Sequence, residues 1–208
     1  MLNTIRIAVR TTLLTLLVTG LLYPLGMTLL AQWVFPSRAH GSLVTDGKGR
    51  VVGSGLIGQR FRSPTYFQPR PSAAGAQGYD AAASSGSNLG PSSLKLRARV
   101  ELELLRLLQD NPQSSSAIPG DLVTASASGL DPHLSVKAAL WQVSRVARAR
   151  GITAERVRIV VLDHVEGREL GLIGEPRVNV LLLNLAMDRQ FGQPTGEAQP
   201  SKQTGVTN

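Results

Sequence analysis

Cysteine is absent from all 208 residues of the chain, and aromatic residues make up only 4% of it. Without thiols the chain has no disulfide, no cysteine nucleophile and no zinc–thiolate site. Any folded domain must therefore hold together through its hydrophobic core alone. Because aromatic residues are so few, leucine, valine and alanine must supply most of that core.

The basic residues form no clustered run, although the formal net charge is +8 and the sequence pI is about 10.8. They are scattered singly between Arg6 and Lys202. A chain with this positive charge could bind nucleic acid, anionic lipid or an acidic protein surface. Since no segment resembles a nucleic-acid-binding arm, we expect membrane lipid to be the partner and we expect no nucleic acid.

Charged residues are also missing between Arg10 and Arg38, where leucine dominates the sequence TTLLTLLVTGLLYPLGMTLLAQWVF. About 20 apolar residues cross the hydrocarbon core of a bilayer. The segment therefore predicts a transmembrane helix over residues 11–36, behind an N-terminal arm of residues 1–10. The apolar stretch is too long for the hydrophobic region of a cleaved signal peptide, and no A-x-A cleavage site follows it.

Tyr23, Pro24 and Gly26 lie in the middle of this predicted helix. We expect a kink there and expect these three residues to contact neighbouring membrane helices, which cover a backbone carbonyl that a kink sets free. Arg6 and Arg10 favour a cytoplasmic N-terminus. The rest of the chain is then extracytoplasmic.

Residues 37–191 predict a small α+β domain that is mainly helical and contains a short β-hairpin. Residues 43–44 and 51–52 are apolar and flank TDGKGR, whose Asp46-Gly47 pair is typical of a hairpin turn. The polar residues 192–208 predict a disordered tail. The fold class expected is thus one N-terminal transmembrane helix followed by a small extracytoplasmic α+β domain.

Residues 61–91 are rich in Gly, Ala, Ser and Pro, but they also contain Phe61, Tyr66, Phe67 and Tyr79. Two interpretations remain open: an ordered loop that makes contacts, and a mobile tether. Pure linkers lack aromatic residues, so we favour the ordered loop.

Two helices are predicted from their composition and capping residues. Leu94–Gln109 alternates like a strand but consists of helix-forming residues, with Ser92 as its N-cap. The second helix is expected to have Asp131 as N-cap and Pro132 as its first residue, and to end at Gly151.

Three features near the C-terminus leave alternatives open. Trp141 lies among cations on the polar face of the second helix, where it is either an anchor for a partner or covered by a neighbouring loop. Ile152–Val165 fits a helix or a strand, because it is rich in β-branched residues. Pro176 begins a last apolar element, RVNVLLLNLAMD, which is too short to cross a membrane and predicts a core helix.

A glycine pattern, Gly53-x-Gly55-x-x-Gly58, follows apolar residues and matches the dinucleotide-binding fingerprint. That fingerprint must open a helix whose N-terminus meets the phosphates. Pro64 would end any such helix within two turns. We therefore interpret the pattern as a glycine-rich bend beside a strand.

The segment DLVTASASGLDPHLS concentrates hydroxyl, carboxylate and imidazole groups. A hydrolase would use a serine as nucleophile and His133 as base. No G-x-S-x-G or S-x-x-K pattern accompanies it, so we favour a polar turn. His40, His133 and His164 show no metal-ligand spacing, and we expect no metal site. The residues singled out in this motif loop are Asp121, Ser126, Ser128, Gly129 and Asp131.

Seven segments in order along the chain carry a family resemblance: TGLLYPLG, VGSGLIGQ, YFQPRPS, SNLGPS, DLVTASASGLDPHLS, QVSRVARARG and GEPRVNVLLLNLAMD. Each alone is weak, but the ordered set is specific. The chain resembles the C subunit of the Kdp-type potassium-transporting P-type ATPase, the KdpC family.

The resemblance implies a complex in the bacterial inner membrane, with this chain crossing once and its domain in the periplasm. The implied partners are a channel-like potassium-binding subunit, the P-type ATPase subunit that hydrolyses ATP, and a very small membrane subunit. The C subunit itself then has no catalytic residue. The family is described as a catalytic chaperone that raises the ATP affinity of the ATPase subunit.

For individual residues, the resemblance links Gln142 with the nucleotide effect. ATP is a possible ligand, and no firmly bound cofactor is expected. A periplasmic domain would meet no ATP, so we expect the chain to act through its membrane helix, with the domain covering the entrance of the channel-like subunit. The alternative is a membrane-anchored extracytoplasmic hydrolase or ligand-binding module. Residues expected to contact partners are Tyr66, Phe67, Arg70, Trp141, Arg145 and Arg148.

Overall fold

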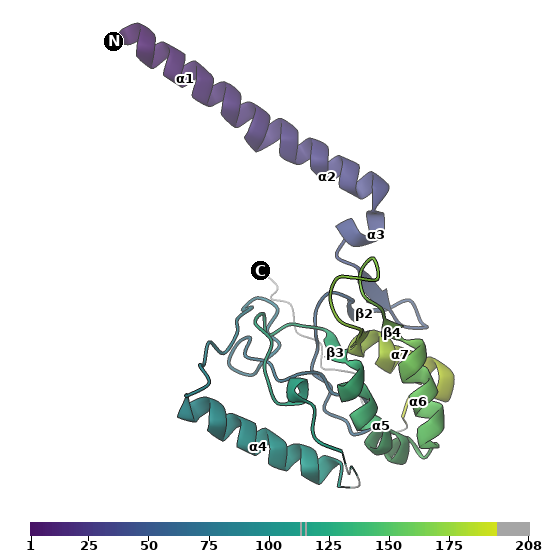
Figure 1. Cartoon of the computed structure of the whole chain (residues 1–208). Helices are drawn as coiled ribbons and strands as arrows, with labels where there is room; N and C mark the ends of the chain where they lie inside the picture. The colour runs from purple at the N-terminus through teal and green to yellow at the C-terminus, as the bar shows by residue number, and fades with distance from the viewer. Residues whose placement is uncertain (113, 115, 195–208) are drawn as a thin grey trace. The chain divides into compact units, whose positions relative to one another are not determined.

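The computed structural model describes residues 1–112, 114 and 116–194, and the chain divides into two compact units, Met1–Leu43 and Val44–Asn208. Unit 1 is built from helical segments that follow one another directly (Figure 1). They are α1 (Leu2–Leu17), the π-helical η1 (Val18–Leu22), α2 (Tyr23–Val34) and the single turn α3 (Pro36–Ala39).

The apolar helix of unit 1 is continuous over Leu2–Val34, and it is long and apolar enough to cross a membrane. It begins at Leu2, so the arm of residues 1–10 is helical as well. At about 1.5 Å per residue, the helix extends well beyond the ~30 Å hydrocarbon core, which allows its first turns to leave the lipid. The point along the helix where the membrane begins stays a prediction.

The expected distortion near Pro24 takes the form of a π-helical turn. Proline has no N–H group, and its ring crowds the carbonyl of the preceding turn. The wider turn Val18–Leu22 lies directly before Tyr23 and Pro24, and the helix continues through both residues. The proline is therefore accommodated by local unwinding and does not end the helix.

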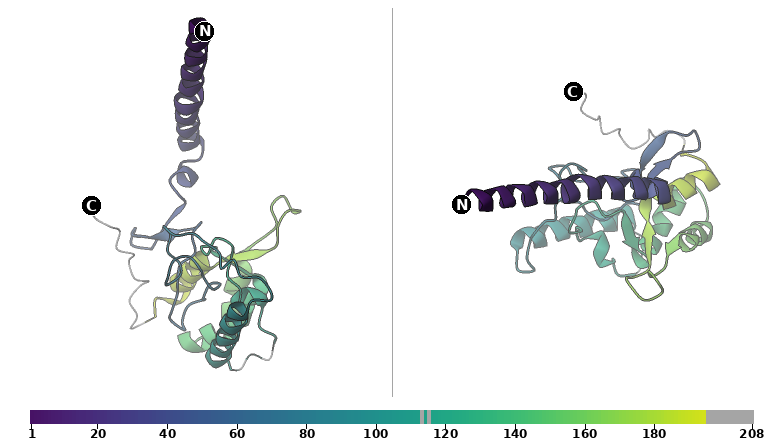
Figure 2. Two further views of the ribbon diagram at one scale, coloured as in Figure 1. Left: turned by 90° about the vertical axis from the view of Figure 1, so that its left-hand side faces the viewer. Right: turned by 90° about the horizontal axis from the view of Figure 1, so that it is seen from above.

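Unit 2 contains two small sheets and four α-helices among its described residues (Figures 1 and 2). The predicted hairpin is confirmed, since β1 and β2 pair in a two-stranded sheet. The strands are β1 (Leu43–Thr45), β2 (Val51–Ser54), β3 (His133–Ser135), β4 (Val165–Glu166) and β5 (Arg177–Asn179). The helices are α4 (Leu94–Asp110), the 3-10 turn η2 (Gly120–Leu122), α5 (Val136–Arg150), α6 (Ala154–Asp163) and α7 (Val180–Phe191).

The second sheet is antiparallel, with strand order β3-β5-β4, and the sequence analysis did not foresee it. It corrects the expected start of α5. Residues 133–135 pair with residues 177–179, so Asp131 and Pro132 precede a strand and not a helix. The Asp131 carboxylate accepts a hydrogen bond from the His133 N–H at 3.0 Å, and Ser135 caps α5 instead. His133 therefore lies in β3, and not in a first helical turn.

Other boundaries follow the expectations more closely. Ser93, and not Ser92, caps α4. Gly151 ends α5 with a φ of 66°, as predicted for a left-handed C-cap. The open choice for Ile152–Val165 resolves into helix α6 followed by the short strand β4. The segment after Pro176 starts as β5 and becomes the core helix α7, with Asn179 as its N-cap.

The core of unit 2 lies between α5, α6, α7 and the second sheet, and valine, leucine and alanine dominate it. The segment of residues 61–91 is an ordered loop, because Phe61, Phe67, Ala74 and Tyr79 are all buried. Its aromatic side chains pack inside the domain. The fold class is thus confirmed: an N-terminal apolar helix followed by a mainly helical α+β domain. The predicted disorder of residues 195–208 lies outside the described residues.

Candidate functional site

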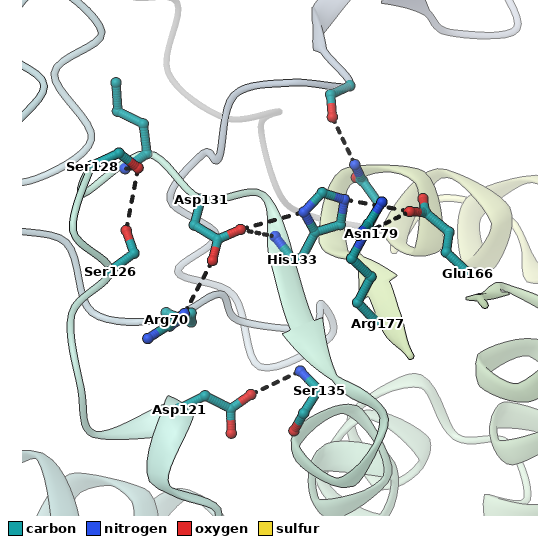
Figure 3. Close-up of polar contacts among 12 residues, drawn as sticks. Arg70, Asp121, Ser126, Ser128, Asp131, His133, Ser135, Glu166, Arg177 and Asn179 are labelled. Carbon is teal, nitrogen blue, oxygen red and sulfur yellow. Dashed lines mark hydrogen bonds and ion pairs between the residues drawn. The ribbon is translucent and has the colours of Figure 1, made fainter. Parts of the chain in front are cut away.

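Sequence segments that are far apart in the chain meet around the motif loop of residues 121–135 (Figure 3). The Gly58 N–H donates a hydrogen bond to the Leu130 carbonyl at 2.7 Å, and the Asn179 amide donates to the Gly55 carbonyl at 2.8 Å. A Cβ atom on Gly58 would lie 2.6 Å from the Asp131 carbonyl oxygen. The glycine pattern therefore permits close backbone packing. It leads from β2 into turns, and no helix opens there to receive a phosphate.

The 61–91 loop packs against the same motif loop. The Ser72 hydroxyl donates to the Gly129 carbonyl at 2.6 Å. Gly129 has a φ of 68°, and a Cβ atom there would lie 2.6 Å from the Ser85 carbonyl oxygen and 2.7 Å from the Ala74 nitrogen. A side chain at position 129 is thus excluded by both conformation and space.

The serines of the motif loop bind their own backbone. Ser126 Oγ accepts from the Gly129 N–H at 2.9 Å, and Ser128 Oγ accepts from the Leu130 N–H at 3.1 Å. Asp121 in turn accepts from the Ser135 N–H at 2.8 Å. These are the side-chain-to-backbone bonds of a polar turn, as predicted.

His133 lies in a row of ionisable side chains that crosses the second sheet (Figure 3). Its Nδ1 atom is 3.3 Å from Asp131, and its Nε2 atom is 3.5 Å from Glu166. Arg70 pairs with Asp131 at 3.1 Å, and Arg177 pairs with Glu166 at 3.1 Å. The imidazole thus faces carboxylates on both sides, which does not make a serine–histidine pair.

Opposing effects act on the pKa of the Asp131 carboxyl group. Burial alone would raise its pKa, but the hydrogen bonds from His133 and the nearby Arg70 cation outweigh burial and hold the pKa below its usual range. Sequence reasoning did not single out Glu166 or Arg177. Arg177 lies in the GEPRVN segment, which identified the region but gave no reason to choose this side chain, and Glu166 lies outside every segment that carried the resemblance.

An open depression of about 620 Å³ lies over the motif loop. Its charged lining residues are Arg70 and Asp131, which pair with each other, so it offers no excess positive charge to a phosphate. The depression is lined by Leu56, Ile57, Arg70, Ser84, Ala125, Ser126, Ala127, Ser128, Leu130, Asp131 and Pro132. Among the described residues, no group of three His, Cys, Asp or Glu side chains is placed to hold a metal.

Gln142 is buried and hydrogen-bonds both backbone groups of Gln68. Its Oε1 accepts from the Gln68 N–H at 2.8 Å, and its Nε2 donates to the Gln68 carbonyl at 3.0 Å. The same Oε1 also accepts from Arg145 at 2.6 Å. A direct bond from Gln142 to a nucleotide would require these bonds to break, so its link with nucleotide stays a prediction.

Asn184 binds the neighbouring residue in the same way. Its Oδ1 accepts from the Phe67 N–H at 2.8 Å, and its Nδ2 donates to the Phe67 carbonyl at 2.9 Å. Each amide thus replaces a β-strand partner for one loop residue. We call residues 64–68 the clamped loop, because α5 holds one part of it and α7 the other.

Two arginines of α5 also hold the clamped loop in place through its backbone carbonyl groups. Arg145 donates to the carbonyls of Pro64 at 2.6 Å and Tyr66 at 3.1 Å, and Arg150 donates to the Thr65 carbonyl at 2.7 Å. Burial lowers the pKa of Arg145 to about 10. Burial, aided by the negative charge of Asp188, raises the pKa of Tyr66 to about 12.

The residues expected to contact partners fall into two groups. Phe67, Trp141 and Arg145 are buried, at 0%, 6% and 5% exposure. Trp141 is covered by a neighbouring segment, with its ring N–H 3.4 Å from the Ser116 carbonyl oxygen, which was the second interpretation of this residue. The structure gives these three an internal role.

The second group is more accessible. Tyr66 and Arg70 are half-buried and Arg148 is exposed, so partner contact through them stays a prediction. Tyr23, Pro24 and Gly26 are exposed on the helix of unit 1, and a Cβ atom on Gly26 would meet nothing within 4 Å. A neighbouring membrane helix can therefore approach Gly26 closely, and this contact also stays a prediction.

Comparison with known proteins agrees with the resemblance seen in the motifs. The family model described as "KdpC: K+-transporting ATPase, c chain" matches residues 5–189, which include unit 2 from the hairpin to α7 and nearly all of the apolar helix.

Relatives named potassium-transporting ATPase KdpC subunit match along most of their length. The protein of Myxococcus xanthus is 62% identical over 200 residues, which cover 96% of this chain and 94% of the relative. That of Rhodopseudomonas palustris is 52% identical over 90% of this chain and 98% of the relative. That of Rhodospirillum rubrum is 49% identical over 92% and 98%. The chain therefore belongs to the KdpC family, the c chains of K+-transporting ATPases.

Proposed function

We propose that this chain is a non-catalytic subunit of an ATP-driven, high-affinity potassium uptake complex, and that it supports the assembly and stability of that complex. Family membership is the observation that carries the proposal. The motif loop adds to it: Ser126 and Ser128 bind backbone N–H groups, and His133 faces two carboxylates. This geometry favours a structural loop over a hydrolytic one.

The proposal places the chain in the bacterial inner membrane, with a cytoplasmic N-terminus and unit 2 in the periplasm. The continuous apolar helix Leu2–Val34 supports a single crossing. Arg6 and Arg10, at the start of the helix, favour the cytoplasmic side for the N-terminus. The proposed partners are a channel-like potassium-binding subunit, the P-type ATPase subunit and a small membrane subunit.

An effect on ATP affinity would then be indirect. The two charged residues that line the depression over the motif loop, Arg70 and Asp131, pair with each other. The side-chain amide of Gln142 is already hydrogen-bonded to Gln68 and Arg145. We propose that the chain biases the conformations of the ATPase subunit through its membrane helix, without holding ATP itself. Unit 2 would cover the entrance of the channel-like subunit.

Deletion and complementation test this function. Cells that lack the chain are expected to fail to grow at limiting potassium, and the tagged wild-type chain is expected to restore growth and to co-purify with the three other membrane subunits. If growth without the chain equals wild-type growth and no other subunit co-purifies, the proposal is wrong. In the purified complex, removal of the chain should raise the KM for ATP.

A triple substitution distinguishes the proposed subunit function from the hydrolase alternative. S126A/S128A/H133A removes the two serine hydroxyls and the imidazole that a hydrolase site in the motif loop would use. Growth at limiting potassium is expected to persist with this variant wherever the variant accumulates in the membrane at the wild-type level. A purified wild-type chain that turns over a hydrolase substrate, and loses that activity in the triple variant, would favour the alternative.

A further inference from the structure

The loop between β4 and β5 presents three large apolar side chains to solvent. Leu170, Leu172 and Ile173 are 90%, 84% and 64% exposed. We call these three residues the apolar tip. The loop projects from the same end of unit 2 at which the chain enters it through the β1–β2 hairpin (Figures 1 and 2). Exposed apolar groups gathered at one projecting point are typical of a contact site.

Backbone hydrogen bonds hold the apolar tip in one shape. Glu169 and Ile173 exchange two bonds, of 2.9 and 3.0 Å, and form an isolated β-bridge. Inside this bridge, the Gly171 N–H donates to the Arg168 carbonyl at 3.0 Å, and the Leu172 N–H donates to the Glu169 carbonyl at 3.1 Å. The loop therefore has a defined conformation even though its side chains contact little of the domain.

Leu170 is strained within this shape. Its φ is 52°, in the left-handed region that leucine rarely adopts, and its side chain is the most exposed of the three. Such a conformation is unfavourable for a residue with a side chain and occurs preferentially at functional sites. A flexible apolar loop would not need this strain, whereas a contact with a shaped surface gains from a preorganised loop.

The charges at the base of the loop are already paired. Arg168 binds Glu175 at 3.0 Å, while Arg177 binds Glu169 at 3.2 Å and Glu166 at 3.1 Å. Residues 166–177 thus carry two arginines against three glutamates, a net charge of −1. Segments that insert among anionic headgroups present unpaired Lys and Arg. The charge pattern therefore favours an uncharged protein surface over lipid.

We propose that the apolar tip docks into an uncharged, apolar pocket on the extracytoplasmic surface of another membrane subunit of the transport complex. This inference rests on the proposed function as a subunit of that complex. Leu172 and Ile173 fill the pocket, Leu170 orients the loop, and the paired arginines and glutamates form the rim. Such a small apolar anchor inside a rim of paired charges is a common arrangement of protein–protein hot spots.

Co-purification with the full chain in its complex tests the inference. The variant L172D/I173D is expected to reduce the yield of co-purified subunits roughly tenfold or more, because charge enters an apolar pocket. Its thermal unfolding should match that of the wild type, since both side chains are exposed. The control L94D/L102D changes two exposed leucines of α4, at 81% and 69% exposure, and is expected to leave the yield unchanged.

A wild-type yield from L172D/I173D would overturn the inference while the proposed function stands. Failure of the wild-type chain to co-purify with any subunit would instead count against the proposed function. A photoreactive benzoylphenylalanine at Leu172 identifies the occupant directly. An adduct with another subunit supports the inference. Adducts with lipid alone, adducts with a second copy of this chain, or no adduct would overturn it.

Discussion

Asn184 and Gln142 each satisfy both backbone groups of one residue in the clamped loop. Loops usually leave such groups to water, but Phe67 is fully buried and water does not reach it. The amide side chain has one acceptor and one donor group at a spacing that matches a peptide N–H and C=O. A single substitution therefore removes two hydrogen bonds and leaves two buried backbone groups without partners.

The first prediction concerns the two hydrogen bonds between Asn184 and Phe67. N184L keeps the branching of the side chain at Cγ, with a bulkier apolar end, and removes both bonds to Phe67. Because each of the two orphaned buried groups costs about 1–3 kcal/mol, we expect a loss of roughly 2–6 kcal/mol in the free energy of unfolding. Thermal and urea unfolding of the full chain in detergent, followed by circular dichroism, measures it.

The matched control is Q109L, which changes an exposed amide on α4. We expect its unfolding to stay within about 0.5 kcal/mol of the wild type. If N184L and Q109L unfold alike, the amide does not hold the loop. The sequence placed Asn184 within a predicted core helix but did not reveal its role, because its partner lies 117 residues away and no local pattern indicates the contact.

Among the secondary structure elements, those with a complete local signal were predicted well. The β1–β2 hairpin has a turn sequence between apolar pairs, and α4 has a capping serine and helix-forming residues. The second sheet was missed because its strands have two or three residues, too few for any periodicity. Asp131-Pro132 resembles a helix start, but strand pairing of residues 133–135 overrides this local preference.

The second prediction concerns the hairpin and its acid dependence. Hydrogen bonds from the backbone N–H groups of Arg50 and Lys48, together with the Arg50 guanidinium, lower the pKa of Asp46 to about 2, against 3.8 for an unperturbed aspartate. The unfolded chain then binds more protons than the folded chain between these values. The stability that Asp46 contributes is therefore present above pH 3.8 and is lost as the pH falls through about 2.

D46N tests this dependence, because asparagine keeps the shape but not the charge. The variant is expected to be less stable than the wild type at pH 6, and the difference should vanish as the pH approaches 2. Urea unfolding at several pH values, in one detergent and at constant ionic strength, provides the comparison. A difference that stays constant from pH 6 to pH 2 would mean that the Asp46 charge does not stabilise the hairpin.

At the scale of the whole molecule, the chain consists of an apolar helix and a folded domain linked through a short segment. The helix was predictable because a long, charge-free and leucine-rich sequence favours a helix of membrane-crossing length. The family was predictable because seven segments occur in order. The packing that brings those segments together depends on long-range contacts, so the roles of Glu166, Arg177 and the apolar tip emerged only from the fold.

The third prediction concerns the sides of the membrane. The chain has no cysteine, so one introduced cysteine gives a unique label. S144C, at an exposed position of α5, is expected to react with a membrane-impermeant maleimide in intact spheroplasts. N3C, at the start of α1, is expected to react only after the membranes are disrupted.

Mass-tag gel shifts measure the labelled fraction for both variants. Labelling of N3C but not S144C in intact spheroplasts would reverse the proposed topology. Equal labelling of both sites before and after disruption would show that the membrane was leaky, and the comparison is then repeated with a cytoplasmic marker protein as the integrity standard.

The clamped loop also fixes an order of events during synthesis. Phe67 leaves the ribosome long before Asn184, which is 117 residues further along the chain. Until α7 has formed, the N–H and carbonyl groups of Phe67 have only water to bind, and the aromatic ring has no complete core to enter. Closing so long a stretch of chain is entropically slow compared with local hairpin or helix formation. The domain is therefore completed only after α7 has been synthesised. A chain that stops short of α7 leaves the clamped loop with exposed apolar side chains and unpaired backbone groups, which quality-control proteases can recognise.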